Sequence, residues 1–341
     1  MSKSAQQNLV AMSSQLQKLR QRLLGQERAA LAQAITLIES SRPDHREESE
    51  QLLQSLLPHS GRAWRIGISG PPGAGKSTFI NKFGLEVIKQ GHRVAVLAVD
   101  PSSQRDGGAI LADKTRMQDL AQNNTSFIRP SPSGMNLGGV ARYTRETMLL
   151  CEAAGYDVVM VETVGVGQSE TMAAQMTDLF LVLIPPANGD ELQGMKRGIL
   201  ELADLIVINK ADGQLLPFAE QTANEYRHAL QLFAANKGEE RQYVALCSAM
   251  TGQGLSALWQ KVQVMLDTQQ KNGMFEQKRL NQGAYWLNHE LQQQLWEALQ
   301  QHKSLHEEFN RLQAQVKQQL ILPSQAARLM VKSLLSQNSN N

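Results

Sequence analysis

Short apolar runs alternate with helix-length segments through the middle of this chain. The runs lie at 65–69, 93–99, 157–161, 179–184, 204–208 and 243–246. Several are rich in valine and isoleucine and lack polar alternation, which is typical of strands that are buried on both faces. The pattern therefore predicts an α/β fold with a mostly parallel central sheet flanked by helices.

Both ends of the chain show helical spacing instead. From about Leu9 to Leu57, and again after about Asp267, apolar residues recur every three or four positions. An isolated helix needs its apolar stripe buried to be stable, so we expect the C-terminal helices to pack on their own domain or on a second copy. The predicted regions are an N-terminal helical extension at 1–62, an α/β domain at 63–266 and a C-terminal helical arm at 267–341.

A glycine-rich segment directly follows the first apolar run. It reads Gly70-Pro71-Pro72-Gly73-Ala74-Gly75-Lys76-Ser77-Thr78 and fits the pattern GxxxxGK[ST]. Glycines let backbone N–H groups face phosphates, Lys76 reaches the outer phosphates, and the Ser77 hydroxyl is a ligand for Mg²⁺. The alternative is a simple glycine-rich turn, but such a turn does not require Lys-Ser at the start of the following helix. The segment therefore predicts a nucleoside triphosphate site, an α/β fold of the P-loop NTPase type, and a P-loop domain at 63–266.

A second motif stands at the end of the run 204–208. Asn209-Lys210-Ala211-Asp212 fits the pattern NKxD, and the Asp212 carboxylate can accept from both N1–H and the exocyclic amine of guanine. Adenine lacks that donor pair. The motif alone is a common surface loop, but after a phosphate loop it predicts GTP and GDP as the ligands. At the end of the next run we expect further contacts with the base from Ser248, Ala249 and Met250.

Acidic residues follow two of the central runs. Glu162 stands where GTPases more often carry Asp, and Asp100 ends the run 93–99. An acid at the end of a buried strand is costly unless it has a partner such as Mg²⁺. We therefore expect Asp100, Asp113 and Glu162 to join Ser77 around Mg²⁺ and its water shell. The alternative for each acid is a helix cap or a solvated loop residue.

Composition and charge narrow the function classes further. The 341 residues carry a net charge of +2 and no long basic run, which gives little reason to expect nucleic acid or a membrane as partner. Cys151 and Cys247 lie far apart without a CxxC pattern, which fits a reducing, cytoplasmic setting. No apolar stretch approaches the ~20 residues of a membrane span. Residues 1–26 are rich in Ser, Lys and Arg, so an organellar transit peptide is the alternative to a cytoplasmic location.

With these motifs in place, the chain resembles the MeaB/ArgK family of GTPases over nearly its whole length. The resemblance is carried by Val99-Asp100-Pro101-Ser102-Ser103 and by the segments 113–117, 137–141, 150–157 and 162–170. A further segment at 189–196 resembles the additional switch of this family. By resemblance, Asp190, Gln193 and Lys196 transmit the nucleotide state to a partner enzyme.

The resemblance implies a specific cellular role. The family acts as a G-protein chaperone of an adenosylcobalamin-dependent acyl-CoA mutase, usually methylmalonyl-CoA mutase, and couples GTP hydrolysis to cofactor delivery and protection. It also implies a homodimer formed through the arm at 267–341. The chain departs from the family pattern at Asp106, Ala109 and Ala112, which fall in the presumed first switch. An extra acid near the phosphates weakens nucleotide binding, unless Asp106 points into solvent.

The expected reaction is in-line attack of water on the γ-phosphate. Lys76, Mg²⁺ and backbone N–H groups would stabilise the charge that spreads over the transferring oxygens. Asp100, Glu162 and Lys196 are the other candidate catalytic residues, and no residue is identified as a general base. We expect slow intrinsic turnover that a partner accelerates by ordering the switches.

Three other functions remain open from the sequence. A nickel or cobalt insertion GTPase is one, although His92, His228 and His289 are scattered rather than clustered. A kinase or ATPase linked to arginine or ornithine transport is the second, and guanine selection argues against it. The third is a non-enzymatic scaffold in which nucleotide only orders a dimer.

Overall fold

The computed structural model of this chain describes residues 12–40, 42–99, 117–130, 137–163, 168–186, 197–237 and 243–337. The chain divides into two compact units, Met1–Arg279 and Leu280–Asn341. The boundaries after residues 62 and 266 stay a prediction. No helix in the described ranges is long and apolar enough to cross a membrane.

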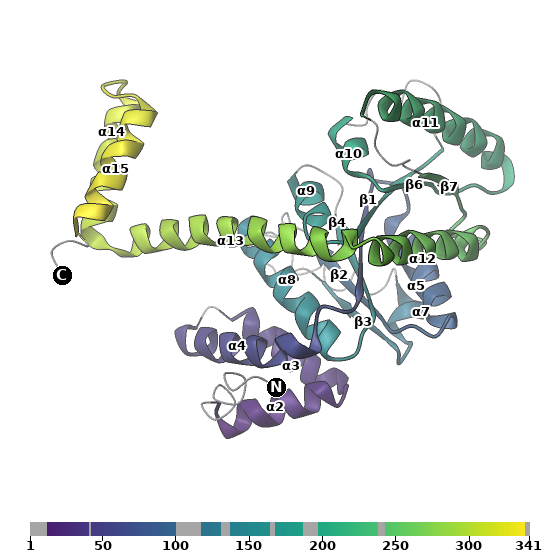
Figure 1. Ribbon diagram of the computed structural model, residues 1–341, viewed down its shortest axis with the longest axis horizontal. Helices are drawn as coiled ribbons and strands as arrows, with labels where there is room; N and C mark the ends of the chain where they lie inside the picture. Colours follow the sequence, from purple (N-terminus) through teal and green to yellow (C-terminus); the bar gives the residue numbers. More distant parts are fainter. Residues whose placement is uncertain are drawn as a thin grey trace. The chain divides into compact units, whose positions relative to one another are not determined.

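A seven-stranded sheet forms the centre of the first unit (Figure 1). Its strand order is β3-β2-β4-β1-β5-β6-β7, and every neighbouring pair is parallel. The strands are β1 (Trp64–Ser69), β2 (Val94–Val99), β3 (Ser126–Arg129), β4 (Val158–Thr163), β5 (Leu179–Ile184), β6 (Leu205–Ile208) and β7 (Tyr243–Leu246). The predicted parallel sheet is confirmed. Strand β3 was missed because only two of its residues, Phe127 and Ile128, are apolar, so it forms no apolar run.

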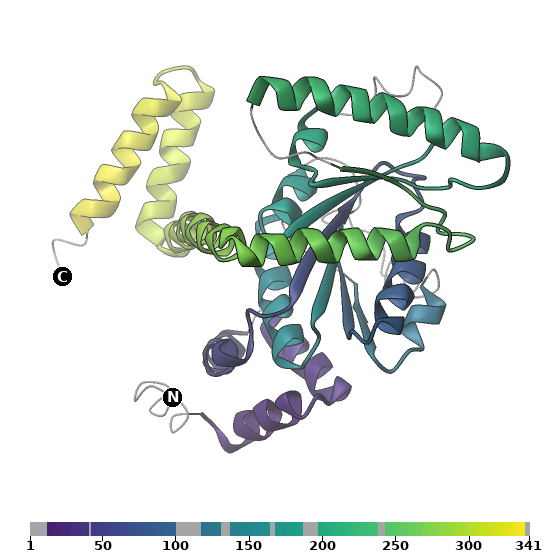
Figure 2. The same ribbon diagram turned by 45° about the vertical axis from the view of Figure 1, so that its right-hand side comes forward.

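Helices cover both faces of this sheet (Figures 1 and 2). On one face α5 (Lys76–Lys89) contacts both α12 (Leu255–Lys271) and the short α7 (Gln118–Ala121). On the other face α8 (Leu137–Ala153) and α9 (Gln168–Ala174) contact the central strands. Two more helices, α10 (Arg197–Leu202) and α11 (Leu216–Lys237), accompany β5, β6 and β7. Burial on both faces explains why these strands read as continuous apolar runs.

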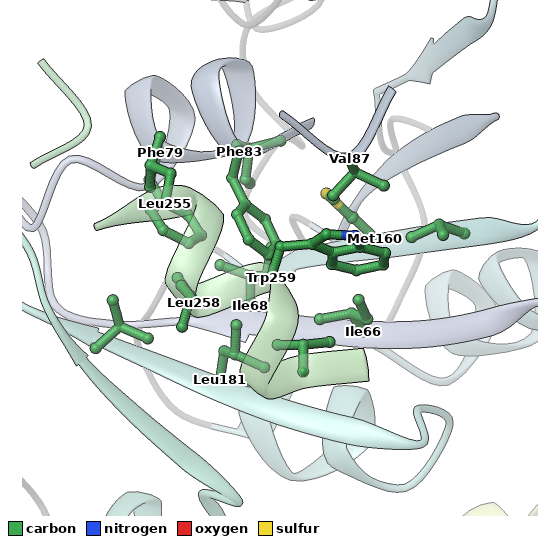
Figure 3. Close-up of a cluster of buried hydrophobic side chains, with 14 of the residues drawn as sticks. Ile66, Ile68, Phe79, Phe83, Val87, Met160, Leu181, Leu255, Leu258 and Trp259 are labelled. Atoms are coloured by element: carbon green, nitrogen blue, oxygen red, sulfur yellow. The ribbon is translucent and has the colours of Figure 1, made fainter. Parts of the chain in front are cut away.

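The main core lies between the sheet and helices α5 and α12 (Figure 3). Trp259 of α12 packs edge-on against Phe83 of α5, with 6.0 Å between ring centroids. Phe83 in turn stacks on Phe79 at 5.0 Å, and all three side chains are fully buried. The core therefore fixes α5 on the sheet, and α5 begins with the Lys-Ser pair of the phosphate loop.

Aspartates at the amino ends of the strands form hydrogen bonds to neighbouring strands at that edge of the sheet. Each precedes one strand and accepts a hydrogen bond from a backbone N–H at the start of a neighbouring strand. The bonds run from Arg93 N to Asp157 (2.7 Å), from Arg65 N to Asp178 (2.7 Å) and from Phe180 N to Asp204 (2.8 Å). The predicted site residues lie at the opposite edge of the sheet, which contains the carboxyl ends of β1, β4, β6 and β7.

The N-terminal residues form the predicted helices and pack on α8, which covers one face of the sheet. Helices α2 (Ser14–Leu24), α3 (Arg28–Ile38) and α4 (Pro43–Leu56) contact one another, and a 3-10 turn at Leu57–His59 follows. Helices α3 and α4 also contact α8. A partly buried ion pair between Glu39 and Arg129 joins this layer to β3. The extension therefore covers the β3 side of the sheet.

The C-terminal unit is entirely helical where it is described. It contains most of α13 (Met274–Gln301), followed by α14 (Lys303–Lys317) and α15 (Pro323–Gln337). Its small core consists of Leu299, Leu305, Leu312, Ala326 and Met330. The predicted helical character of this region is confirmed.

Candidate nucleotide site

The backbone of the phosphate loop requires glycine at two positions. Gly70 has a φ of +147°, and a Cβ added there would lie 2.2 Å from the Leu183 carbonyl oxygen of β5. Gly75 has a φ of +84°, and its added Cβ would lie 2.9 Å from Asn209 Nδ2. Gly75 is also the N-cap of α5, so no capping side chain covers the first N–H groups of that helix. The loop therefore has the backbone shape that phosphate binding needs.

Lys76 lies folded over this loop. Its ammonium donates hydrogen bonds to the carbonyl oxygens of Gly70 (2.7 Å) and Pro71 (3.2 Å). Burial lowers the pKa of Lys76, and the negative charges of Glu162 and Glu170 partly offset this effect. The side chain is thus held at the loop that the sequence assigns to the phosphates.

Ser77 and Glu162 meet beside Lys76. The Ser77 hydroxyl donates to Glu162 Oε1 over 3.3 Å, and Glu162 is buried in β4. A hydroxyl and a carboxylate are oxygen ligands of the kind that Mg²⁺ takes, and Mg²⁺ usually keeps waters and phosphate oxygens for its other positions. Within the described ranges no group of three or more His, Cys, Asp and Glu could hold a metal ion. The pair fits a Mg²⁺ site that nucleotide and water complete.

Asn209 connects the base motif to the phosphate loop. It is 1% exposed, and its Nδ2 donates to the Ala74 carbonyl oxygen over 2.8 Å. Its Oδ1 accepts from the Ala249 backbone N–H (3.0 Å) and from the Cys247 thiol (3.7 Å). One buried amide therefore ties together three loops that follow different strands.

Asp212 and Ser248 face each other at the same edge. The Ser248 hydroxyl donates to the Asp212 carboxylate, and the Ala211 N–H donates to the Cys247 carbonyl oxygen (3.0 Å). Lys210 adopts a left-handed backbone conformation with φ of +59° and has an exposed side chain. These bonds hold the NKxD segment against the loop after β7, as a base pocket requires.

The remaining predicted residues divide into two groups. Thr78 and Met250 are described and exposed, Met250 to 83%. The others lie outside the described residues: Asp100, Asp106, Ala109, Ala112, Asp113, Asp190, Gln193 and Lys196. Of the predicted metal shell only Ser77 and Glu162 are therefore described, and the three residues of the predicted partner switch all lie outside the described residues.

Two side chains at this site were missed by reasoning from the sequence. Glu170 of α9 is 1% exposed and acts electrostatically on Lys76, and the Cys247 thiol supports Asn209. For Glu170 the only sequence signal is its place in the family segment that begins at Glu162. For Cys247 it is the position just before Ser248 and Ala249, which suggested nothing for the thiol itself.

The fold and this arrangement define a P-loop GTPase. In comparisons with known proteins, the profile of the family described as methylmalonyl Co-A mutase-associated GTPase MeaB matches residues 31–307. The chain therefore belongs to the MeaB family, binds guanine nucleotides and hydrolyses GTP.

Individual relatives agree with this assignment. The chain is 45% identical to the GTPase ArgK of Escherichia coli, over 89% of each chain. It is 43% identical to the methylmalonic aciduria type A homolog, mitochondrial, of Mus musculus, over 92% of this chain and 78% of the mouse protein. A crystal structure described as LAO/AO transport system kinase superposes with a TM-score of 0.76 at 37% identity, covering 95% of this chain and 98% of that one.

Proposed function

We propose that this GTPase is a chaperone of an adenosylcobalamin-dependent acyl-CoA mutase, with methylmalonyl-CoA mutase as the client. The observation that carries the proposal is the match over residues 31–307 to a family described by its association with that mutase. The likeness to the mouse methylmalonic aciduria type A homolog points the same way. In this role GTP hydrolysis is coupled to loading of the cofactor into the mutase and to its protection.

We assign the chemistry of hydrolysis to the loop Gly70–Thr78 and its neighbours. Open N–H groups at the start of α5 and the Lys76 ammonium would bind the outer phosphates and stabilise their charge during the reaction. Ser77 and Glu162 would hold Mg²⁺, which when bound neutralises charge on the phosphate oxygens. Asp100, Asp113 and Lys196 are assigned by resemblance only, as is the partner switch of Asp190, Gln193 and Lys196.

This assignment has a direct test in Lys76→Ala. The variant should lose GTP hydrolysis by at least about a hundredfold, because it lacks the cation placed at the outer phosphates. Full activity in the variant would reject the mechanism. Lys82→Ala, on the exposed side of the same helix, is the matched control and should hydrolyse GTP normally.

The proposed homodimer is supported by the apolar surface of α13. Leu280, Leu287, Leu291 and Leu295 recur seven and four residues apart on this helix, and each is about half exposed or more. That spacing places them on one helical stripe, and such a stripe needs a partner surface. Leu287→Glu combined with Leu291→Glu should give a monomer by light scattering. A dimer in that variant would exclude this face as the interface.

A cytoplasmic location is the other part of the proposal. Both cysteines are free and buried, and burial raises the pKa of the Cys247 thiol to about 12. Thiols of this kind stay reduced and unreactive, as expected for a protein of a reducing compartment.

The client assignment is tested by hydrolysis assays with the purified full-length protein. GTP turnover would be measured alone and with the adenosylcobalamin-dependent methylmalonyl-CoA mutase from the same source, with ATP as the control nucleotide. Stimulation by the mutase that is specific for GTP is the expected result. GTP turnover that is unchanged by the mutase would support the GTPase activity but reject the mutase as the client. Phosphate transfer to an acceptor would favour the kinase alternative.

A further inference from the structure

Two hydroxyl groups are buried where β1 and β4 end beside the phosphate loop. Ser69 is the last residue of β1, Thr163 is the last residue of β4, and both are 0% exposed. The Thr163 hydroxyl donates a hydrogen bond of 2.8 Å to the Ser69 hydroxyl. Taking a hydroxyl out of water is costly unless it is paired, and an apolar residue at each strand end would avoid that cost. The presence of a matched pair therefore requires an explanation.

The hydroxyl pair lies on the face of the sheet opposite to Glu162. Ile68 of β1 packs in the main core with α5 and α12 (Figure 3). Successive side chains of a strand point to opposite faces, so Ser69 points away from α5, toward the face that α9 covers. Glu162 points toward α5, where it meets Ser77, and Thr163 therefore points away from it. The hydroxyl bond is thus separate from the proposed metal site.

Backbone pairing between β1 and β4 stops one residue before this bond. Within the described residues, the last pair of that ladder is Ile68 with Glu162. Thr163 is paired on its other side with β2, and Ser69 is paired on its other side with β5. The hydroxyl bond therefore continues the link between β1 and β4 to the point where the chain leaves the sheet.

The residue that follows Ser69 is the first of the phosphate loop. Gly70 runs so close to β5 that an added Cβ would lie 2.2 Å from the Leu183 carbonyl oxygen. The Gly70 carbonyl oxygen accepts the 2.7 Å hydrogen bond from the Lys76 ammonium. Because the peptide unit between Ser69 and Gly70 is planar and stiff, a shift of Ser69 moves the start of the loop. A bond that fixes Ser69 on its β4 side therefore also fixes where the loop begins.

We propose that Ser69 and Thr163 are positioning residues of the phosphate site, whose hydroxyl bond holds the start of the phosphate loop against β4 before nucleotide binds. A loop that already has its binding shape loses less conformational freedom on binding, so the bond strengthens nucleotide affinity. A loop of this type binds phosphates that GDP and GTP share, so both nucleotides benefit alike. The inference rests on the proposed assignment of the phosphate site to Gly70–Thr78, and it is independent of the mutase client.

The test measures nucleotide affinity in EDTA, so that no metal contributes. Binding of mant-GDP and of the triphosphate analogue mant-GMPPNP would be followed by fluorescence. Thr163→Val keeps the branched shape but lacks the hydroxyl, and it should bind both nucleotides about fivefold more weakly than the wild type. Ser69→Ala should lose a similar factor. Thr144→Val is the matched control, because it removes a buried hydroxyl that donates within α8 to Val140, and it should change neither affinity.

A double-mutant cycle tests whether the two residues act through their bond. Ser69→Ala combined with Thr163→Val should bind no more weakly than either single variant, because each change alone already breaks the bond. Thr163→Ser keeps the hydroxyl and should stay within about twofold of the wild-type affinity. Ser69→Ala carries the test by itself if Thr163→Val does not fold.

Three results would overturn the inference. They are unchanged affinity in the single variants, losses that add in the double variant, and a loss that is seen only when Mg²⁺ is present. A lower melting temperature with unchanged affinity would show that the pair is only structural, and a loss confined to Mg²⁺ would place its effect at Glu162. If Lys76→Ala binds mant-GDP as tightly as the wild type, the phosphate-site assignment itself is rejected.

Discussion

Asn209 forms a bridge of buried hydrogen bonds between the phosphate loop and the loop after β7. This bridge gives a quantitative prediction for Asn209→Ala. The substitution removes the buried bonds to the Ala74 carbonyl oxygen (2.8 Å) and the Ala249 N–H (3.0 Å). Each backbone group left without a partner costs about 1 to 3 kcal/mol, so the two together cost about 2 to 6 kcal/mol. We expect about 3 kcal/mol, because the emptied space next to a ligand pocket admits water that replaces part of the lost bonding.

The assay is denaturant unfolding of the nucleotide-free protein, followed by titration with mant-GDP. Asn209→Ala should lower the free energy of unfolding by about 3 kcal/mol and weaken GDP by tenfold or more, because the base loop and the phosphate loop are no longer tied together. Asn224→Ala, at an exposed position of α11, is the matched control and should change neither quantity. An Asn209→Ala protein with wild-type stability would refute the bridge. Lost stability with unchanged GDP affinity would refute its part in nucleotide binding.

Further substitutions at four positions test the phosphate loop, the core and the amino edge of the sheet. Gly70→Ala places a Cβ against a β5 carbonyl and should abolish nucleotide binding in a gel-filtration assay, whereas Gly73→Ala meets no neighbouring atom and should bind more weakly but measurably. Trp259→Phe should lower the free energy of unfolding by at most about 1 kcal/mol in denaturant unfolding, because the buried indole N–H has no partner among the described residues. Trp259→Ala should lower it by about 3 to 5 kcal/mol. Asp178→Ala leaves Arg279 buried without its carboxylate and should cost about 3 to 5 kcal/mol by the same method; a loss below about 1 kcal/mol would contradict the buried pair.

The sheet could be predicted from the sequence because its strands are buried on both faces. Runs such as 179–184 and 204–208 are almost purely apolar, and the structure has β5 and β6 within one residue of those bounds. Strand β3 could not be found in this way. Only two of its four residues, Phe127 and Ile128, are apolar, whereas all four residues of the other edge strand, β7, are apolar or aromatic.

The site was predictable only where the motif itself fixes the geometry. Glycine positions in the phosphate loop and the NKxD segment are set by local backbone shape, and both are brought together at the carboxyl edge. The buried Glu170 could not be identified from its sequence neighbours, because its burial on α9 comes from tertiary packing. Tertiary contacts of that kind leave no local pattern.

The most direct test of the account is a change of base preference through Asp212. In Asp212→Asn the side-chain amide can donate to the 2-oxo group of xanthine and accept from its N1–H, but it no longer offers two acceptors to guanine. Hydrolysis of GTP and XTP would be compared for the wild type, Asp212→Asn and the exposed control Asp267→Asn. We predict that only Asp212→Asn prefers XTP, by about tenfold or more. An Asp212→Asn protein that kept the wild-type preference for GTP would contradict the assignment of the guanine site.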